Sequence, residues 1–103
     1  MDDTVRQHIE KTLSDNDVVL YMKGSRSIPR CGFSAQVVEI LDRHQTKYLD
    51  VDVLSEPELR TSIKEFSGWP TFPQLYVKGR LVGGCDVVSE LDRTGELSTL
   101  LGT

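Results

Sequence analysis

Amphipathic stripes and short apolar runs alternate along the chain and predict alternating helices and strands. Between residues 4 and 14, Val5, Ile9 and Leu13 recur every four positions among polar side chains, which is typical of a surface helix. Residues 18–22, Val-Val-Leu-Tyr-Met, form a continuous apolar run of β-branched and aromatic character. Such a run favours a strand that is buried on both faces. We therefore expect residues 18–22 to form the central strand of a sheet.

A loop, a second helix and a second strand are predicted next. Residues 23–30 contain the glycine, serine and proline that are typical of a loop. Residues 33–44 place a broad apolar face opposite charged side chains, which predicts a helix. Residues 48–53 alternate between apolar and polar side chains, as an edge strand does. Because a helix lies between the two strands, a right-handed parallel β-α-β unit is expected.

A third helix and an irregular segment follow. Ser55 is predicted to be the N-cap of this helix, because Glu58 stands three residues later and Pro57 falls in the first turn. Residues 67–73 contain two prolines and are therefore expected to be irregular.

The last third of the chain predicts a β-hairpin and two helices. Residues 74–77 and 80–82 flank a Lys-Gly turn and are expected to pair as antiparallel strands. Asp86 follows a glycine-rich turn and is predicted to cap a helix, and a short helix is expected over residues 96–101. The chain is thus expected to be one α/β domain, residues 1–103, with helices on both faces of a mixed sheet.

Composition and charge exclude several classes of function. With 103 residues, 38% of them hydrophobic, the chain can bury one core without disulfide bonds. A net charge of −4 provides no global positive field for nucleic acid or for an anionic membrane. No apolar run approaches the length of a membrane span. We therefore expect neither nucleic acid nor a membrane among its partners.

The N-terminal sequence and the cysteines bear on the compartment. Residues 1–4, Met-Asp-Asp-Thr, lack the features of a secretory signal or a transit peptide. Cys31 and Cys85 are the two cysteines, and their spacing matches neither a disulfide framework nor a zinc site. A reducing, cytoplasmic environment is expected, and an organelle matrix, reached by a mature form without its transit peptide, is the alternative.

Cys31 is the candidate reactive residue. It stands where the predicted loop meets the predicted helix, and there unpaired backbone N–H groups and the positive end of the helix dipole favour a thiolate. Arg30 and Lys23 are expected to favour the thiolate further. A cysteine at a helix start is also compatible with an incidental structural role, so the position alone leaves both interpretations open.

Several motifs together carry a family resemblance. The sequence Cys-Gly-Phe-Ser at residues 31–34 follows Lys-Gly-Ser at 23–25 and precedes Trp-Pro-Thr-Phe-Pro-Gln-Leu at 69–75 and Gly-Gly-Cys-Asp at 83–86. In order and spacing, and nearly from end to end, the chain resembles a monothiol glutaredoxin of the CGFS type. The resemblance implies a thioredoxin fold with a central four-stranded mixed sheet, glutathione binding, and a role in carrying a [2Fe–2S] cluster.

The resemblance also implies a set of ligand-binding residues. Lys23 and Arg60 would bind the glycine carboxylate of glutathione, a cis bond before Pro73 would present the backbone of Phe72, and Asp86 would bind the γ-glutamyl ammonium. For Arg60 a solvated helix face is the alternative. The same interpretation is preferred for Lys64. The implied glutathione site consists of Lys23, Cys31, Phe33, Arg60, Thr71, Phe72, Pro73, Gly84, Cys85 and Asp86, with Cys31 also the cluster ligand.

Four side chains, with Phe33 of the implied site among them, are assigned ordinary structural roles. Phe33 is expected to pack around the thiol rather than react, and Trp69 to be buried beside the proline loop. His8 and His44 have no partner at metal-ligand spacing, so solvated histidines are expected.

Two interpretations of Cys85 remain open. It opens the turn that is expected to face the site, where it could form a disulfide with Cys31 under oxidation. The alternative is a small, partly buried structural residue.

Ser34 separates the functional hypotheses, because it stands where dithiol relatives carry a second cysteine. A serine cannot form a disulfide, so an intermediate at Cys31 cannot be released from within the same site. The first hypothesis is a cluster carrier, in which Cys31 from two chains and two glutathione thiols supply the thiolates of a [2Fe–2S] cluster. The second is a glutathione-dependent monothiol oxidoreductase acting on protein–glutathione mixed disulfides. Whether the protein is an efficient enzyme is left open.

A third hypothesis, a pure interaction module, would leave the thiolate-favouring surroundings of Cys31 unexplained. The carrier is therefore preferred. It implies a monomer as apo-protein and a homodimer when the cluster is bound. By resemblance, the partners are BolA-like proteins and apo iron–sulfur proteins that receive the cluster.

Overall fold

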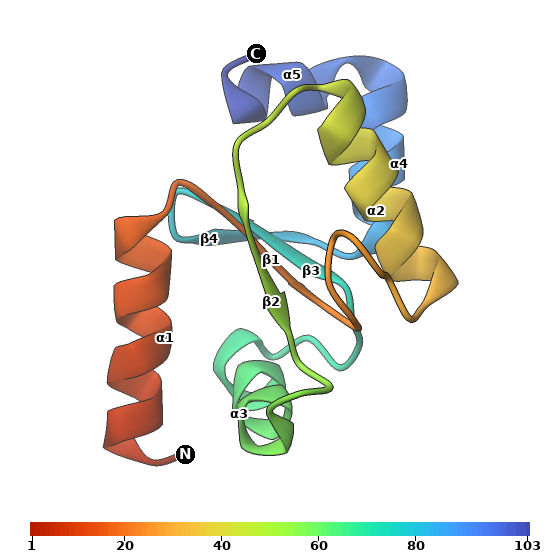
Figure 1. Ribbon diagram of the computed structural model, residues 1–103. Helices are drawn as coiled ribbons and strands as arrows, with labels where there is room; N and C mark the ends of the chain where they lie inside the picture. The colour runs from red at the N-terminus through yellow and green to blue at the C-terminus, as the bar shows by residue number, and fades with distance from the viewer.

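The protein is built around a four-stranded mixed sheet with the strand order β2-β1-β3-β4, as the computed structural model of residues 1–103 shows (Figure 1). The central strand β1 (Val18–Met22) pairs in parallel with the edge strand β2 (Leu49–Asp52). On its other side β1 pairs antiparallel with β3 (Gln74–Val77), which forms a hairpin with β4 (Arg80–Gly83). The predicted mixed sheet is confirmed, with the parallel pair formed across a helix.

Five helices complete the domain and cover both faces of the sheet. In Figure 1, α1 (Asp3–Asp15) and α3 (Pro57–Ser67) lie on one side, and α2 (Gly32–Arg43) and α4 (Cys85–Thr94) lie on the other. The short helix α5 (Glu96–Leu101) follows α4. None of these helices combines the length and apolar character that crossing a membrane would require.

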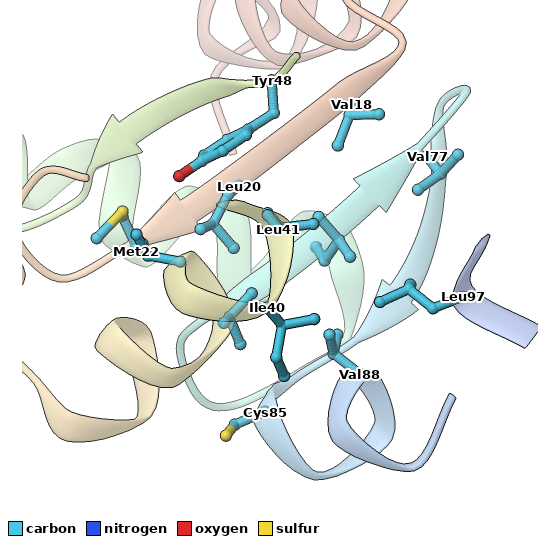
Figure 2. Close-up of a cluster of buried hydrophobic side chains, with 13 residues drawn as sticks. Val18, Leu20, Met22, Ile40, Leu41, Tyr48, Val77, Cys85, Val88 and Leu97 are labelled. Carbon is cyan, nitrogen blue, oxygen red and sulfur yellow. The ribbon is translucent and has the colours of Figure 1, made fainter. Parts of the chain in front are cut away.

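Two hydrophobic cores result from the alternation of side chains along β1. Leu20 and Met22 belong to the core beneath α2 and α4 (Figure 2), whereas Val19 and Tyr21 belong to the core beneath α1 and α3. All five residues of β1 are buried, which confirms the prediction of a strand enclosed on both faces.

The predicted cap at Ser55 is wrong. Helix α3 begins at Pro57 with Glu56 in the N-cap position, and no side chain caps it. The Ser55 hydroxyl instead donates to Asp52 Oδ2 at 2.9 Å, and the backbone N–H of Leu54 donates to Asp52 Oδ1 at 2.9 Å. The carboxylate of Asp52, at the end of β2, thus accepts from the hydroxyl that was expected to cap the helix.

The predicted cap at Asp86 is also wrong. Helix α4 begins at Cys85 with Gly84 in the N-cap position, so Asp86 lies in the first turn with its side chain exposed. The cap position has little space for a side chain, because a Cβ on Gly84 would lie 3.2 Å from the carbonyl oxygen of Pro73. The carboxylate of Asp86 still lies at the positive end of the helix, where it is electrostatically favoured.

Candidate functional site

A cleft of about 540 Å³ lies where the end of β1, the N-termini of α2 and α4, helix α3 and the proline loop meet. It brings together every residue that the sequence analysis assigned to the site, although these residues are up to 63 positions apart between Lys23 and Asp86. Four further residues line the cleft, and none of them was predicted as a ligand contact. The full lining consists of Lys23, Cys31, Phe33, Arg60, Lys64, Trp69, Pro70, Thr71, Phe72, Pro73, Gly84, Cys85, Asp86 and Val87.

Cys31 occupies the N-cap position of α2, in an extended conformation with φ −152° and ψ 134°. The pKa of its thiol is lowered chiefly by the backbone N–H of Ser34. Burial is the second-largest effect and opposes this lowering, whereas the N–H of Phe33 and the charge of Lys23 add to it. Helix N-termini favour thiolates for this reason. Cys31 is partly exposed and lines the cleft, so the sulfur is both activated and accessible.

Arg30 is not among the groups that lower the pKa of Cys31, contrary to the prediction. Its positive charge acts instead on the carboxylate of Asp52, whose pKa it helps to lower. The backbone N–H of Arg30 donates to the carbonyl of Lys23 at 2.9 Å and closes the loop before Cys31. The contribution of Arg30 to the site is therefore made by its backbone.

Ser34 is completely buried, and its hydroxyl connects the site to the sheet. Its Oγ accepts a hydrogen bond from the backbone N–H of Lys23 at 3.2 Å, and the same hydroxyl helps to lower the pKa of Cys31. The residue that stands in place of a second cysteine therefore positions the first one.

The proline loop is organised by Gln74, a residue that the sequence analysis placed in a strand and in the motif at 69–75 but did not assign to the site. The bond between Phe72 and Pro73 is cis, as the resemblance implied. The Gln74 side chain is completely buried, and its Nε2 donates to the carbonyls of Trp69 at 3.0 Å and Thr71 at 3.1 Å. A polar residue that begins a buried strand was the available signal, because such a side chain must find hydrogen-bond partners nearby.

Three cations line the cleft in a protein whose net charge is −4. Lys23 and Arg60 are partly buried there, as expected. The prediction that Lys64 lies on a solvated face is wrong, because Lys64 is partly buried and its Nζ lies 5.9 Å from the centre of the Phe72 ring. Its spacing one turn from Arg60 was the signal in the sequence.

The aromatic predictions are only partly met. Phe33 lines the cleft but is 61% exposed, so it does not enclose the thiol. Trp69 is half-buried beside the proline loop, and its indole N–H is buried without a hydrogen-bond partner. The indole approaches α4 closely, since a Cβ on Gly84 would lie 3.3 Å from Trp69 Nε1.

Cys85 is a free, buried thiol with properties opposite to those of Cys31. Burial raises the pKa of Cys85, and the hydroxyl of Ser89, 3.9 Å from its sulfur, only partly offsets this effect. Figure 2 shows Cys85 as part of the hydrophobic core under α2 and α4. The interpretation of Cys85 as a small buried residue agrees with this position, and a disulfide on oxidation stays a prediction.

The two histidines differ in their exposure to solvent. His8 is exposed on α1, as expected, but His44 is largely buried, and its Nε2 lies 2.7 Å from Asp92 Oδ1 on α4. Arg43 donates to the other oxygen of Asp92 at 2.8 Å. The expectation of a solvated His44 is therefore wrong, because the packing of α2 on α4 supplies its partner. No group of three or more His, Cys, Asp or Glu side chains is placed to hold a metal ion.

Sequence comparisons reveal close relatives. The profile of the glutaredoxin family, described as Glutaredoxin, matches residues 18–82. A protein of Rickettsia felis named probable monothiol glutaredoxin 2 is 50% identical over 95 residues, which are 92% of this chain and 91% of that protein. Glutaredoxin 4 of Escherichia coli strain K12 is 45% identical over 98 residues, which are 95% of this chain and 85% of that protein.

Solved structures with the same fold include proteins of similar sequence. The solution structure of reduced apo GrxS14 from poplar matches with a TM-score of 0.82 and 42% identity, over 92% of this chain and 87% of that one. A buckwheat glutaredoxin–glutathione complex matches with a TM-score of 0.86 over 97% of this chain and 89% of that one. At 23% identity, the second likeness is one of fold alone.

Proposed function

Because the chain belongs to the glutaredoxin family, we propose that it binds glutathione in the cleft and carries a [2Fe–2S] cluster to other proteins through Cys31. One observation carries this proposal. The chain has one accessible thiol with a lowered pKa at the cleft, whereas its second thiol is buried and has a raised pKa.

The charges of the cleft match the charges of glutathione. Lys23 and Arg60 would bind the glycine carboxylate, and Lys64, one turn from Arg60, adds a third cation beside them. The carboxylate of Asp86 would bind the ammonium of the γ-glutamyl group. The glutathione thiol would then lie beside Cys31, because Cys31 belongs to the same cleft.

The cluster would be the cargo of the protein, and the number of thiolate ligands decides how it could be held. A [2Fe–2S] cluster takes four thiolates. One chain offers the single accessible thiol of Cys31, and it has no group of three or more side chains placed to hold a metal ion. Two chains and two glutathione molecules would complete the set, so the apo-protein would be a monomer and the loaded protein a homodimer. Since two ligands would be exchangeable small molecules, the cluster would be transferable to an apo-acceptor.

Partner proteins would bind at the same partly exposed thiol. BolA-like proteins would share the cluster with one chain, and apo iron–sulfur proteins would receive it. Phe33 and Ile28, which are 61% and 63% exposed on either side of Cys31 in the sequence, would provide apolar contact area for such partners.

A second candidate function is a glutathione-dependent oxidoreductase, and the lowered pKa of Cys31 favours it as well. The Cys31 thiolate would attack the glutathione sulfur of a mixed disulfide, and the substrate protein would leave as a thiolate. A second glutathione thiolate would then attack the Cys31–glutathione disulfide and release glutathione disulfide, which regenerates Cys31.

Anaerobic cluster assembly with and without glutathione tests the proposal. Visible absorption would report the cluster, and gel filtration would report the oligomeric state. We expect a homodimer that assembles only with glutathione, that Cys31→Ser abolishes, and that Cys85→Ser retains. A cluster that assembles on Cys31→Ser, or on a wild-type monomer without glutathione, would contradict the carrier. Efficient turnover of glutathionylated substrates without cluster binding would support the oxidoreductase.

A further inference from the structure

Ile28 is the most exposed large hydrophobic side chain of the protein, at 63%. It lies in the loop between β1 and α2, which Figure 1 shows in orange beside the start of α2. Phe33, in the first turn of α2, is 61% exposed. The two side chains therefore leave apolar surface in water on either side of Cys31 in the sequence.

Hydrogen bonds within the loop hold Ile28 in this exposed position. The backbone N–H of Ser25 donates to the carbonyl of Ile28 at 3.2 Å, and the N–H of Ile28 donates to Ser25 Oγ at 3.1 Å. Gly24, with φ +86°, lies so close to this turn that a Cβ there would be 2.5 Å from the carbonyl oxygen of Ile28. Because the turn is already ordered, little conformational entropy remains to be lost when a partner binds it.

Arg30 adds a positive charge beside Ile28. Gly24 and Pro29 form an isolated antiparallel bridge, so the chain is extended at Pro29. Ile28 and Arg30 are both exposed and flank the half-buried Pro29, as expected for side chains on the same side of an extended segment. The guanidinium of Arg30 forms no ion pair within the protein.

The carboxylates of β2 that lie against this loop are bound by other loop groups. Asp52 accepts a hydrogen bond from the backbone N–H of Gly24 at 2.9 Å. Asp50 accepts from the backbone N–H of Arg26 at 2.9 Å and from its Nε at 3.4 Å. The first turn of α2 contains no acidic residue. The side chain of Arg30 is therefore available to a partner.

We propose that Ile28, Arg30 and Phe33 form a docking surface for an acidic segment of a partner protein, in which an apolar side chain stands among carboxylates. The inference rests on the proposed function, because the partner is one that acts at Cys31. Apolar area with a cation at its edge complements such a segment in both shape and charge. A second copy of this chain fits less well, since a two-fold contact centred here would bring two Arg30 side chains together.

Two peptides that differ only in charge test the proposal, because the whole protein and this surface predict opposite preferences. The net charge of −4 favours a basic peptide, whereas the surface around Arg30 favours an acidic one. Both capped peptides carry the same leucines, with glutamate in one and lysine in the other at all remaining positions. Amide chemical shifts of the isotope-labelled, reduced apo-protein should place the acidic peptide at residues 25–33, with an affinity that falls as salt is added.

Substitutions separate the apolar part of this surface from its charge. Ile28→Gln should raise the Kd of the acidic peptide about fivefold, because it removes the central apolar side chain. Arg30→Gln should raise it about threefold and reduce its dependence on salt. The matched controls are Leu100→Gln, at a residue 42% exposed on α5, and Arg80→Gln, at an exposed residue on the opposite edge strand. Both should bind as the wild type does.

Three results would overturn the proposal: no binding of the acidic peptide, a preference of residues 25–33 for the basic peptide, or wild-type affinity in Ile28→Gln. Sedimentation of the apo-protein adds a fourth. Self-association that Ile28→Gln abolishes would mean that a second copy occupies the surface. All these measurements use apo-protein without glutathione or cluster, so a failed docking test is distinguishable from a failed cluster assembly.

Discussion

The hydroxyl of Ser34 accepts a hydrogen bond from the backbone N–H of Lys23 at 3.2 Å, across the junction of strand β1 and helix α2. The residue that stands in place of a second cysteine therefore also joins the thiol-bearing helix to the central strand. Ser34 is completely buried, so its hydroxyl spends its hydrogen-bonding capacity within the protein.

Ser34→Ala should lower the free energy of unfolding by about 1 kcal/mol, because it removes the acceptor of the partly buried N–H of Lys23. It should also raise the pKa of Cys31, since the Ser34 hydroxyl helps to lower it. Urea unfolding and thiol titration measure the two effects. Ser27→Ala, at an exposed serine without a side-chain hydrogen bond, is the control. Equal stability of both variants would show that the Ser34 contact is unimportant.

Lys23→Ala and Arg60→Ala should each weaken glutathione binding without unfolding the domain. A charge-assisted hydrogen bond to a carboxylate contributes about 1.5–3 kcal/mol. Lys64→Ala should weaken binding less, because Lys64 also packs over the ring of Phe72. Titration calorimetry on the folded variants tests this order, with Lys47→Ala on the exposed surface as the control. Unchanged affinity in both Lys23→Ala and Arg60→Ala would mean that the carboxylate binds elsewhere.

Gln74→Leu should loosen the proline loop while it preserves the volume of the buried side chain. The carbonyls of Trp69 and Thr71 would lose their donor, at a cost of about 1–3 kcal/mol in unfolding free energy. The single tryptophan of the chain is Trp69, so its fluorescence reports this loop directly. We expect a shifted emission maximum and weaker glutathione binding, whereas Gln7→Leu on the exposed face of α1 should change neither.

Asp92→Asn should reduce stability in a way that depends on pH. The pKa of Asp92 is lowered by the hydrogen bonds from Arg43 and His44, so the ionised carboxylate stabilises the folded state. This contribution is present above the ordinary aspartate pKa of about 3.9 and disappears as the pH falls through the lower folded value. Denaturation near pH 7 should show a loss of about 1 kcal/mol, which vanishes in acid. A constant difference at all pH values, or an equal loss in Asp42→Asn, would contradict this account.

The fold and most of the site could be predicted because their signals are local. The apolar run of β1 and the alternation over β2 reflect periodicities that each segment carries by itself. The helix start at Cys31 likewise follows from the loop composition before it and the apolar face after it. The motif resemblance then grouped distant segments into one site, and the cleft contains all the residues so grouped.

The predictions that failed concern side chains with competing partners. Ser55 and Asp86 are residue types that cap helices. The hydroxyl of Ser55 donates to Asp52 instead, and helix α4 begins at Cys85, one residue before Asp86. His44 has no partner near it in the sequence, yet α4 brings Asp92 to 2.7 Å. Helix periodicity showed which residues share a face, but not which other element that face would meet.

The sequence by itself determined the order of helices and strands, the place of Cys31 at the start of a helix and the serine three positions after it, because these depend on residue type and local spacing. Only the tertiary structure decided that Arg30 acts on Asp52, that Gln74 organises the proline loop, and that the backbone N–H of Arg26, in the loop between β1 and α2, donates to Asp50 on β2. Each of these depends on a contact between segments far apart in the chain. Hydrogen bonds of this kind are selected by packing geometry, and no local pattern of residues encodes them.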